Sequence, residues 1–275
     1  MQVEFRNIYG LDLAETSAIL NRCFAGYFFP AHFDRPSLAK MIRVDSVDLA
    51  ASIIAEREGE PVGVALVARR GWNSRLAAMA IDPDARGQRV GTAFADHLVH
   101  AARLRGDRSF ELEVIEQNAP ALRLYEQAGF TRVRRLVGYA AESIAAATEP
   151  ALTEVDLVEA AMSVSRWGVE SLPCQISPPA LTALGPPHRA FRLGPASAIM
   201  SHPAVGSVTL CALVVEPGAR RQGWATRLLQ GLSAQFSGMK WRLPILIPEE
   251  IPKAFFTRLG FRKESLTQIQ MTRTL

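Results

Sequence analysis

One pattern of residues occurs twice in this chain of 275 residues and constrains its fold more than any other feature. Residues 80–93 read AIDPDARGQRVGTA, and residues 214–227 read VVEPGARRQGWATR. Each copy passes from apolar residues through an acid and a proline into a turn rich in arginine and glycine, and then into apolar residues at helical spacing. A second repeat follows: LRLYEQAGF (122–130) is similar to KAFFTRLGF (253–261). The chain is therefore expected to hold two tandem copies of one fold.

Strand-like and helix-like periods alternate along both copies, which predicts a mixed α/β fold of the α+β kind. In the first unit, the sequence predicts a strand at 3–8, helices at 11–24 and about 38–47, strands at 52–56, 62–69 and 75–81, a helix at about 90–104, a strand at 109–115, a helix at 119–127 and a strand from 130. In the second, it predicts an amphipathic helix at 155–167, a proline-rich stretch at 173–187 and strands near 189–193, 196–201, 208–215 and 266–274. The expected domains are 1–140, a linker at 141–152, and 153–275.

Composition excludes several classes of protein. No apolar run is long enough to span a membrane, and the first residues do not read as a signal peptide. Three widely separated cysteines argue against a disulfide framework or a metal site and favour a reducing compartment, so the expected location is cytoplasmic. The net charge of +4 is spread along the chain without basic runs interleaved with aromatics, so no nucleic-acid partner is expected.

The repeated turn has the features of a phosphate site. Backbone N–H groups at a helix N-terminus point outward and the helix dipole favours anions, glycine lets the backbone approach, and arginine adds charge. One such turn is more often an ordinary exposed turn. Two turns in equivalent positions are harder to attribute to chance.

DPDARGQRVGTAF followed by LEVIEQNAPALRLYEQAGF resembles the signature of the GNAT superfamily of acetyltransferases. The resemblance extends over most of 1–140, and its motif style is that of the ribosomal-protein alanine N-acetyltransferase group. It implies two tandem units, each with a mixed, mostly antiparallel sheet flanked by helices, and acetyl-CoA as co-substrate without a metal. The cofactor-binding residues that the resemblance implies are Met79, Ala80, Ile81, Arg86, Gly87, Gln88, Arg89, Val90, Gly91, Thr92 and Asn118.

The sequence departs from the family pattern at Arg89, which replaces the central glycine of the turn. Either Arg89 supplies charge to a phosphate, or its side chain obstructs the turn; we favour the former. Asn118 also fits the N-cap of the following helix. The aromatic residues of 24–33 either border the acceptor site, as the resemblance implies, or form a packed loop.

Glu113 and Tyr125 match the positions that the resembling group uses as general base and general acid. Strand alternation places Glu111 and Glu113 on one face, where two carboxylates would attract a cationic amine. The plain alternatives are a solvent-facing Glu113 and a core Tyr125 with its hydroxyl at the surface. In the second unit, aligning the Gly-Phe pairs brings Phe256 opposite Tyr125 and Pro244 or its neighbour opposite Glu113. Catalysis is therefore expected in the first unit alone.

The resulting hypothesis is an N-acetyltransferase that moves an acetyl group directly to a primary amine of a small molecule, a peptide N-terminus or a lysine. Tandem architecture of this kind also occurs in mycothiol synthase, so an amino-sugar or thiol-precursor acceptor is a second enzymatic interpretation. The rival is a non-catalytic acyl-CoA sensor or docking protein. The oligomeric state stays open, a homodimer included. Deleting residues 150–275 is expected to separate the roles of the two units if the first stays folded.

Overall fold

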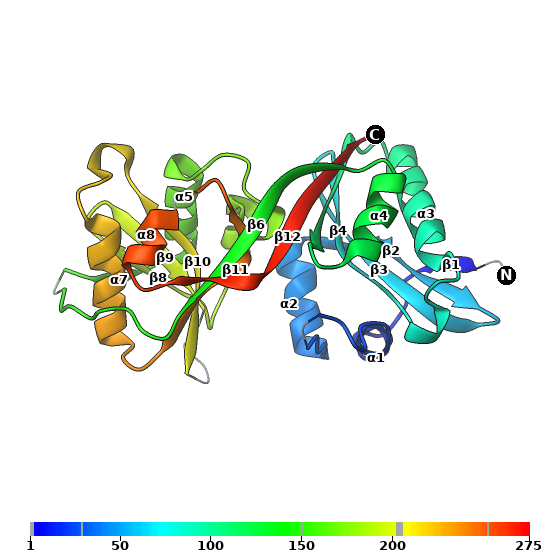
Figure 1. The fold of residues 1–275 in the computed structure, drawn as a ribbon, viewed down its shortest axis with the longest axis horizontal. Coiled ribbons are helices and arrows are strands. Elements are labelled where there is room, and N and C mark those ends of the chain that lie inside the picture. The colour runs from blue at the N-terminus through cyan, green and yellow to red at the C-terminus, as the bar shows by residue number, and fades with distance from the viewer. Residues whose placement is uncertain (1–2, 29, 150, 202–205, 252) are drawn as a thin grey trace. The chain divides into compact units, whose positions relative to one another are not determined.

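The computed structural model describes residues 3–28, 30–149, 151–201, 206–251 and 253–275. The chain divides into two compact units (Figure 1). Unit 1 consists of Met1–Val133 together with Ile269–Leu275, and unit 2 of Arg134–Gln268. These bounds differ from the expected domains, since the last residues of the chain belong to unit 1 and unit 2 begins within a strand. Among the described residues, no helix combines the length and the apolar character that a membrane span requires.

Unit 1 is a layered α/β structure in which the chain alternates between a central sheet and two helical layers. Its elements are β1 (Glu4–Asn7), α1 (Leu13–Cys23), α2 (Arg35–Asp45), β2 (Val47–Arg57), β3 (Glu60–Arg70), β4 (Asn73–Ile81), α3 (Val90–Leu104), β5 (Ser109–Ile115), α4 (Ala119–Gln127) and the start of β6 (Thr131–Ala141). The strands β1 to β4 pair antiparallel in chain order, and β4 pairs parallel with β5. The expected mixed, mostly antiparallel sheet is confirmed.

Helix caps in unit 1 follow local sequence rules. Asp12 caps α1 by accepting a hydrogen bond from the backbone N–H of Ala14 at 2.8 Å. Asp34 and Ser37 form a capping box at the start of α2.

The two faces of the sheet carry separate cores. The helices α1 and α2 pack on one face around Leu20 and Leu38, whereas α3 and α4 pack on the other (Figure 1).

The strands β4 and β5 diverge midway, and this divergence shapes the candidate site. Their parallel pairing covers Asn73–Leu76 and Ser109–Leu112, although both strands continue beyond it. The register of β4 with β3 shifts at the same level, so that Ala77 forms a bulge. Because a bulge increases local twist and bends its strand, it accounts for the separation of β4 from β5.

The last strand of the chain completes the core of unit 1. The end of β12 (Arg262–Thr274) brings Ile269 and Met271, 6% and 0% exposed, into the cluster formed with α3, α4 and β5. The backbone N–H of Leu275 donates to the carbonyl of Arg108 at 3.1 Å. Unit 1 is therefore not a continuous segment of sequence, so a fragment ending near residue 150 lacks part of its core.

Unit 2 repeats this plan. Its elements are β7 (Thr153–Val155), α5 (Leu157–Trp167), α6 (Pro178–Thr182), β8 (Arg189–Leu193), β9 (Ala196–Met200), β10 (Ser207–Val215), α7 (Trp224–Gln235), β11 (Lys240–Pro248) and α8 (Lys253–Arg258), with parts of β6 and β12. The parallel pairing of β10 with β11 covers Ser207–Thr209 and Lys240–Arg242, and Cys211 forms a bulge like that of Ala77. The expected second copy of the fold is therefore present.

The predicted linker lies along α7 in unit 2. Its Ile144 carbonyl accepts a hydrogen bond from Ser233 at 2.6 Å, and the two carboxylate oxygens of Glu149 each lie 2.8 Å from the Arg227 guanidinium. Pro150 lies outside the described residues. The described part of 141–152 thus belongs to unit 2, where it packs along α7.

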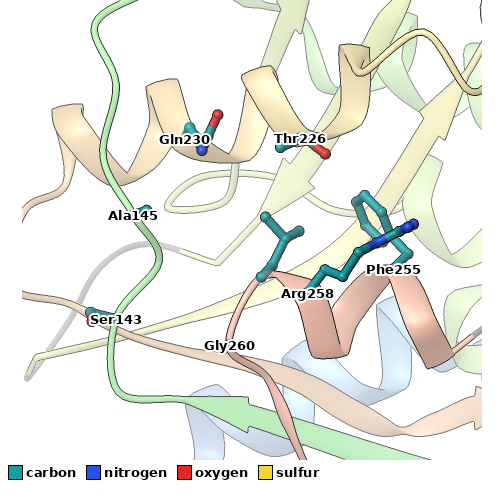
Figure 2. A pocket seen from close by; sticks show the side chains of 8 residues that line it. Ser143, Ala145, Thr226, Gln230, Phe255, Arg258 and Gly260 are labelled. Carbon is teal, nitrogen blue, oxygen red and sulfur yellow. The ribbon is translucent and has the colours of Figure 1, made fainter.

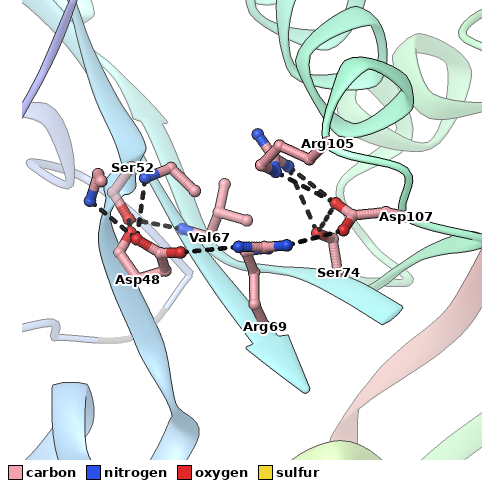
Figure 3. Close-up of polar contacts among 9 residues, drawn as sticks. Asp48, Ser52, Val67, Arg69, Ser74, Arg105 and Asp107 are labelled. Atoms are coloured by element: carbon pink, nitrogen blue, oxygen red, sulfur yellow. Dashed lines mark hydrogen bonds and ion pairs between the residues drawn. The ribbon is translucent and has the colours of Figure 1, made fainter. Parts of the chain in front are cut away.

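A buried polar network connects Ser74, near the start of β4, to Asp107 in the segment after α3 (Figure 3). The Asp107 side chain is 1% exposed and accepts from Ser74 at 2.5 Å, while Arg69 and Arg105 lie within 3.1 Å of its oxygens. Burial raises the pKa of Asp107, but the hydrogen bonds from Ser74 and Arg69 and the charge of Arg105 outweigh it, so that the pKa lies below its ordinary value.

We expect Asp107→Asn to reduce the free energy of unfolding by about 1.5–3 kcal/mol at pH 7, as for other hydrogen bonds to charged groups. A carboxyl whose pKa is lowered by folding stabilises the protein above its unfolded pKa and loses that effect as pH falls through the folded value. The difference from wild type should therefore shrink below about pH 4. Urea unfolding at several pH values measures it. Glu126→Gln, in the exposed pair with Arg132, is the control and should cost less than about 1 kcal/mol. A loss at Asp107 that is equal at pH 3 and pH 7 would contradict this account.

Candidate active site

Arg86, expected to bind cofactor phosphate, has its guanidinium engaged by the protein itself. It donates to the carbonyls of Ile81, Cys23 and Ala25, each at 3.1 Å. It thereby joins the end of β4 to the end of α1. Arg220 does the same in unit 2, where it donates to the carbonyls of Val215 and Trp167. The arginine repeated in both turns thus ties a strand to the first helix of its unit.

The turn itself has the same backbone in both units. Gly87 and Arg89 have φ angles of 76° and 62°, and Arg221 and Gly223 have φ angles of 63° and 85°. Each turn therefore uses two left-handed positions, and the glycine and the arginine have exchanged places between them. A non-glycine residue in this conformation costs roughly 1–2 kcal/mol.

The Arg89 side chain is exposed, and at the equivalent position of unit 2 a Cβ placed on Gly223 meets no atom within 4 Å. The Gln88 amide supports the turn by donating to the Asp84 carbonyl at 2.8 Å, as Gln222 does to Gly218 at 3.1 Å. Whether Arg89 supplies charge to a phosphate or obstructs the turn stays a prediction.

The turn leads into a helix N-terminus suited to an anion. No side chain caps α3, which begins at Val90, so the N–H groups of Val90, Gly91 and Thr92 point out of the first turn. A Cβ on Gly91 would lie 3.1 Å from Leu124 and 3.2 Å from Ile81, so glycine lets α3 pack closely on its neighbours. These residues fit the pyrophosphate of coenzyme A.

Met79, Ala80 and Ile81 lie on β4 beyond the bulge, where β5 no longer pairs with it. Met79 and Ile81 pack against the α3–α4 core, whereas Ala80 belongs to the α1–α2 core. This is the edge against which an extended pantetheine chain could lie.

Glu113 is buried rather than solvent-facing. Its side chain is 2% exposed, and both Nε and Nη2 of Arg75, itself 7% exposed, lie 2.7 Å from its Oε2. Phe110 and Leu112 point into the opposite core, as strand alternation predicted. Asp45 at the end of α2 is part of the same charged group: burial raises the pKa of this carboxyl, the charges of Arg75 and Arg70 oppose that rise, and Glu113 adds to it.

Tyr125 lies on α4 within a group of aromatic and polar side chains. It is 7% exposed, and its ring meets Phe130 edge-on at 5.9 Å. Burial raises the pKa of Tyr125, and the nearby Tyr27 raises it further. Tyr27 shares a hydrogen bond with the side chain of Asn118, which also caps α4 by accepting from the N–H of Ala121 at 3.3 Å. The predicted N-cap is therefore confirmed, while a role of Asn118 near the cofactor stays a prediction.

The aromatic segment 24–33 is partly packed and partly exposed. Phe24 and Phe33 pack on the α1–α2 core, Phe28 is 48% exposed, and Phe29 lies outside the described residues. Tyr27 links this segment to Asn118. The sequence showed the density of aromatics in this segment, but nothing in it predicted the contact of Tyr27 with Asn118 or singled out Arg75 or Asp45.

Unit 2 has different residues at the equivalent positions. Parallel pairing starts with Asn73 and Ser109 in unit 1 and with Ser207 and Lys240 in unit 2. Counting along the strands from these residues makes Pro244 equivalent to Glu113, and Thr209 equivalent to Arg75. The Gly-Phe pairs that follow α4 and α8 bring Phe256 opposite Tyr125. Pro244, Thr209 and Phe256 cannot reproduce the carboxylate, the guanidinium or the phenol.

Unit 2 instead contains a cavity of about 450 Å³ between α7 and α8 (Figure 2). Thr226 and Gln230 project from α7, Phe255 and Arg258 project from α8, and Ser143 and Ala145 close one side. Among the described residues, no group of three His, Cys, Asp or Glu side chains is arranged to hold a metal ion.

In each unit, two parallel strands diverge, and the turn and an uncapped helix connect them. Residues 13–130 match the family described as Acetyltransferase (GNAT) family. The chain therefore contains a GNAT acetyltransferase domain, as its motifs predicted.

Several named proteins are similar to parts of this chain. Streptothricin acetyltransferase from Streptomyces lavendulae is 33% identical over 31% of this chain and 47% of its own length. Mycothiol acetyltransferase from Sanguibacter keddieii is 30% identical over 45% of this chain and 41% of its own length. The bS18-alanine N-acetyltransferase of Escherichia coli is 42% identical over 20% of this chain and 37% of its own length. The chain thus spans less than half the length of these relatives.

The solved structure of a tandem GNAT protein from the clavulanic acid biosynthesis pathway covers 99% of this chain and 98% of its own, with a TM-score of 0.68 and 14% identity. At this level of identity the likeness concerns the fold. It agrees with the tandem form that the internal repeat predicted.

Proposed function

We propose that the protein transfers an acetyl group from acetyl-CoA to a primary amine, directly and within a ternary complex, and that unit 1 carries out the reaction. The observation that carries the proposal is the contrast between the two units. Both have the same turn backbone, whereas the buried Glu113 and Tyr125 occur in unit 1 and are replaced by Pro244 and Phe256 in unit 2. The match of residues 13–130 to the acetyltransferase family supports it.

Acetyl-CoA would be held by two parts of unit 1. The N–H groups of Gly87 to Thr92 and the charge of Arg89 would face the pyrophosphate, and Met79–Ile81 would face the pantetheine arm. The guanidinium of Arg86 would act indirectly, by keeping the turn in place. Asn118 would lie near the cofactor while capping α4.

Glu113 would take a proton from the ammonium group of the acceptor, directly or through a water molecule, because only the neutral amine is nucleophilic. A bond would then form between the amine nitrogen and the acetyl carbon, and the carbon–sulfur bond of the thioester would break. The nitrogen would lose its second proton to water, which leaves the amide, and Tyr125 would regain from water the proton that it gives to the thiolate. Tyr125 would protonate the departing thiolate. Since burial raises its pKa, the phenol keeps its proton at neutral pH. A strand N–H would stabilise the oxyanion.

The acceptor would be a small molecule or peptide that carries a primary amine, in the cytoplasm. The names of the relatives cover small-molecule and protein acceptors alike, so they do not choose between these. A homodimer is compatible with the proposal but not required by it.

The test is turnover of acetyl-CoA in the presence of a panel of primary amines: diamines, amino sugars, amino acids and short peptides. Mass spectrometry should find a product heavier by one acetyl group and release of one equivalent of free thiol. Tight binding of acetyl-CoA without release of thiol, for every amine, would overturn the enzymatic proposal in favour of an acyl-CoA sensor.

A further inference from the structure

The ion pair between Arg75 and Glu113 lies where the backbone pairing of β4 with β5 ends. The β4–β5 ladder ends with Leu76 opposite Leu112, so Glu113 is the first residue of β5 beyond the paired part. Arg75 is the residue of β4 just before the end of the ladder. The pair therefore joins the two strands by side chains where their backbones cease to be joined.

Both partners are withdrawn from water, with side chains 7% and 2% exposed. A buried guanidinium and carboxylate attract each other strongly, and removal of either leaves a costly charge. Two N–H groups of one planar guanidinium bind a single oxygen, Oε2, at 2.7 Å each. This arrangement restricts the rotation of the Glu113 side chain more than one flexible ammonium contact would.

The pair is specific to the unit that carries the proposed chemistry. Unit 2 has the same bulge and the same divergence of its strands, yet Thr209 and Pro244 occupy the two positions. Divergence of the strands therefore does not require the ion pair, and the pair accompanies the candidate base.

We propose that Arg75 is a positioning residue that holds Glu113 in the orientation and charge state needed for proton transfer. The proposal rests on the function proposed above. The other charged groups around the pair belong to three elements: Asp45 and Lys40 on α2, Arg70 on β3 and Glu111 on β5. Arg75 contacts Glu113 and acts through it.

The experiment measures steady-state kinetics against pH for Arg75→Met, Arg75→Lys, Glu113→Gln and the double variant, with the best amine from the panel. We expect Arg75→Met to lower kcat about 10- to 100-fold through misplacement of the carboxylate, while the KM for acetyl-CoA stays unchanged. The acid limb of kcat/KM should move about one unit to higher pH, because an adjacent positive charge is lost. In Arg75→Lys, kcat should be higher than in Arg75→Met, and the acid limb should lie closer to its wild-type pH.

The double variant decides whether Arg75 acts through Glu113. In the Glu113→Gln background, Arg75→Met should leave kcat unchanged, since the group that it positions is already missing. Arg69→Met is the control: it breaks the contact of a partly exposed arginine of unit 1, 31% exposed, with the buried Asp107, and should lower the melting temperature without moving the acid limb.

The proposal would be overturned if folded Arg75→Met had the wild-type kcat and an acid limb at the wild-type pH. It would also be overturned if Arg75→Met lowered kcat by the same factor in the wild-type and in the Glu113→Gln background. If Arg75→Met does not fold, the kcat of Arg75→Lys decides: a reduced kcat with an unchanged KM for acetyl-CoA supports the proposal, and a wild-type kcat overturns it. Wild-type turnover by itself reports on the proposed function, whereas the variant-to-wild-type ratios report on Arg75.

Discussion

Removal of residues 269–275 is expected to unfold unit 1 and abolish acetyl-CoA binding, although these residues are far in sequence from the turn. Truncating a buried Ile or Met side chain to alanine costs about 2–5 kcal/mol, and the deletion removes two such side chains together with strand pairing. The total stability of a domain is about 5–15 kcal/mol. Ile269 and Met271 lie in the same cluster as Phe94 of α3 and Tyr125 of α4, so their loss opens the core beneath the site.

Urea unfolding followed by intrinsic fluorescence, with calorimetric titration of acetyl-CoA, measures both effects. Met271→Leu is the control, because a volume-conserving change in a core costs less than about 1.5 kcal/mol. The result that would contradict the account is a truncated chain with the wild-type unfolding midpoint and wild-type affinity for acetyl-CoA.

Replacement of Tyr125 by Phe should have the largest effect on chemistry. It keeps the ring that packs against Phe130 and removes the proton donor, so kcat should fall about 10²- to 10⁴-fold, the usual contribution of a general acid. The affinity for acetyl-CoA and the melting temperature should change little. Because burial raises the pKa of Tyr125 above its ordinary value of 10.0, deprotonation of this residue should not limit the rate below that pH.

Phe256→Leu, at the equivalent position in unit 2, is the matched control and should leave kcat unchanged. Steady-state kinetics of both variants with one amine gives the comparison. Full activity of Tyr125→Phe would remove this residue from the mechanism, and a loss confined to Phe256→Leu would move attention to unit 2.

Local sequence signals predicted much of the fold correctly because they rest on short-range physics. The Asn118 cap and the turn before α3 depend on residues within a few positions of one another. The helix expected at 38–47 instead ends at Asp45, because Ser46 adopts a left-handed conformation with a φ angle of 61° and the chain enters β2. Nothing in the local pattern excluded one further helical turn there.

The features that the sequence did not predict depend on contacts between residues that are far apart along the chain. Leu266–Thr274 was correctly predicted as a strand, but no local rule says that its last residues complete the core of unit 1. Arg86 and Arg75 look alike in sequence, yet one binds backbone carbonyls and the other binds Glu113, across 38 positions. A charged residue within an otherwise apolar strand was the signal that could have drawn attention to Arg75.

The most direct test of the central claim, that acetyl-CoA is used in unit 1, is calorimetric titration of acetyl-CoA into wild type, Arg89→Glu and Arg221→Glu. The two arginines are matched, since each is exposed and occupies a left-handed position of its turn. The account predicts one molecule bound by wild type, a loss of at least about tenfold in affinity for Arg89→Glu from the missing charge-assisted contact, and no change for Arg221→Glu. Unchanged binding by Arg89→Glu together with lost binding by Arg221→Glu would place the cofactor in unit 2 and contradict it.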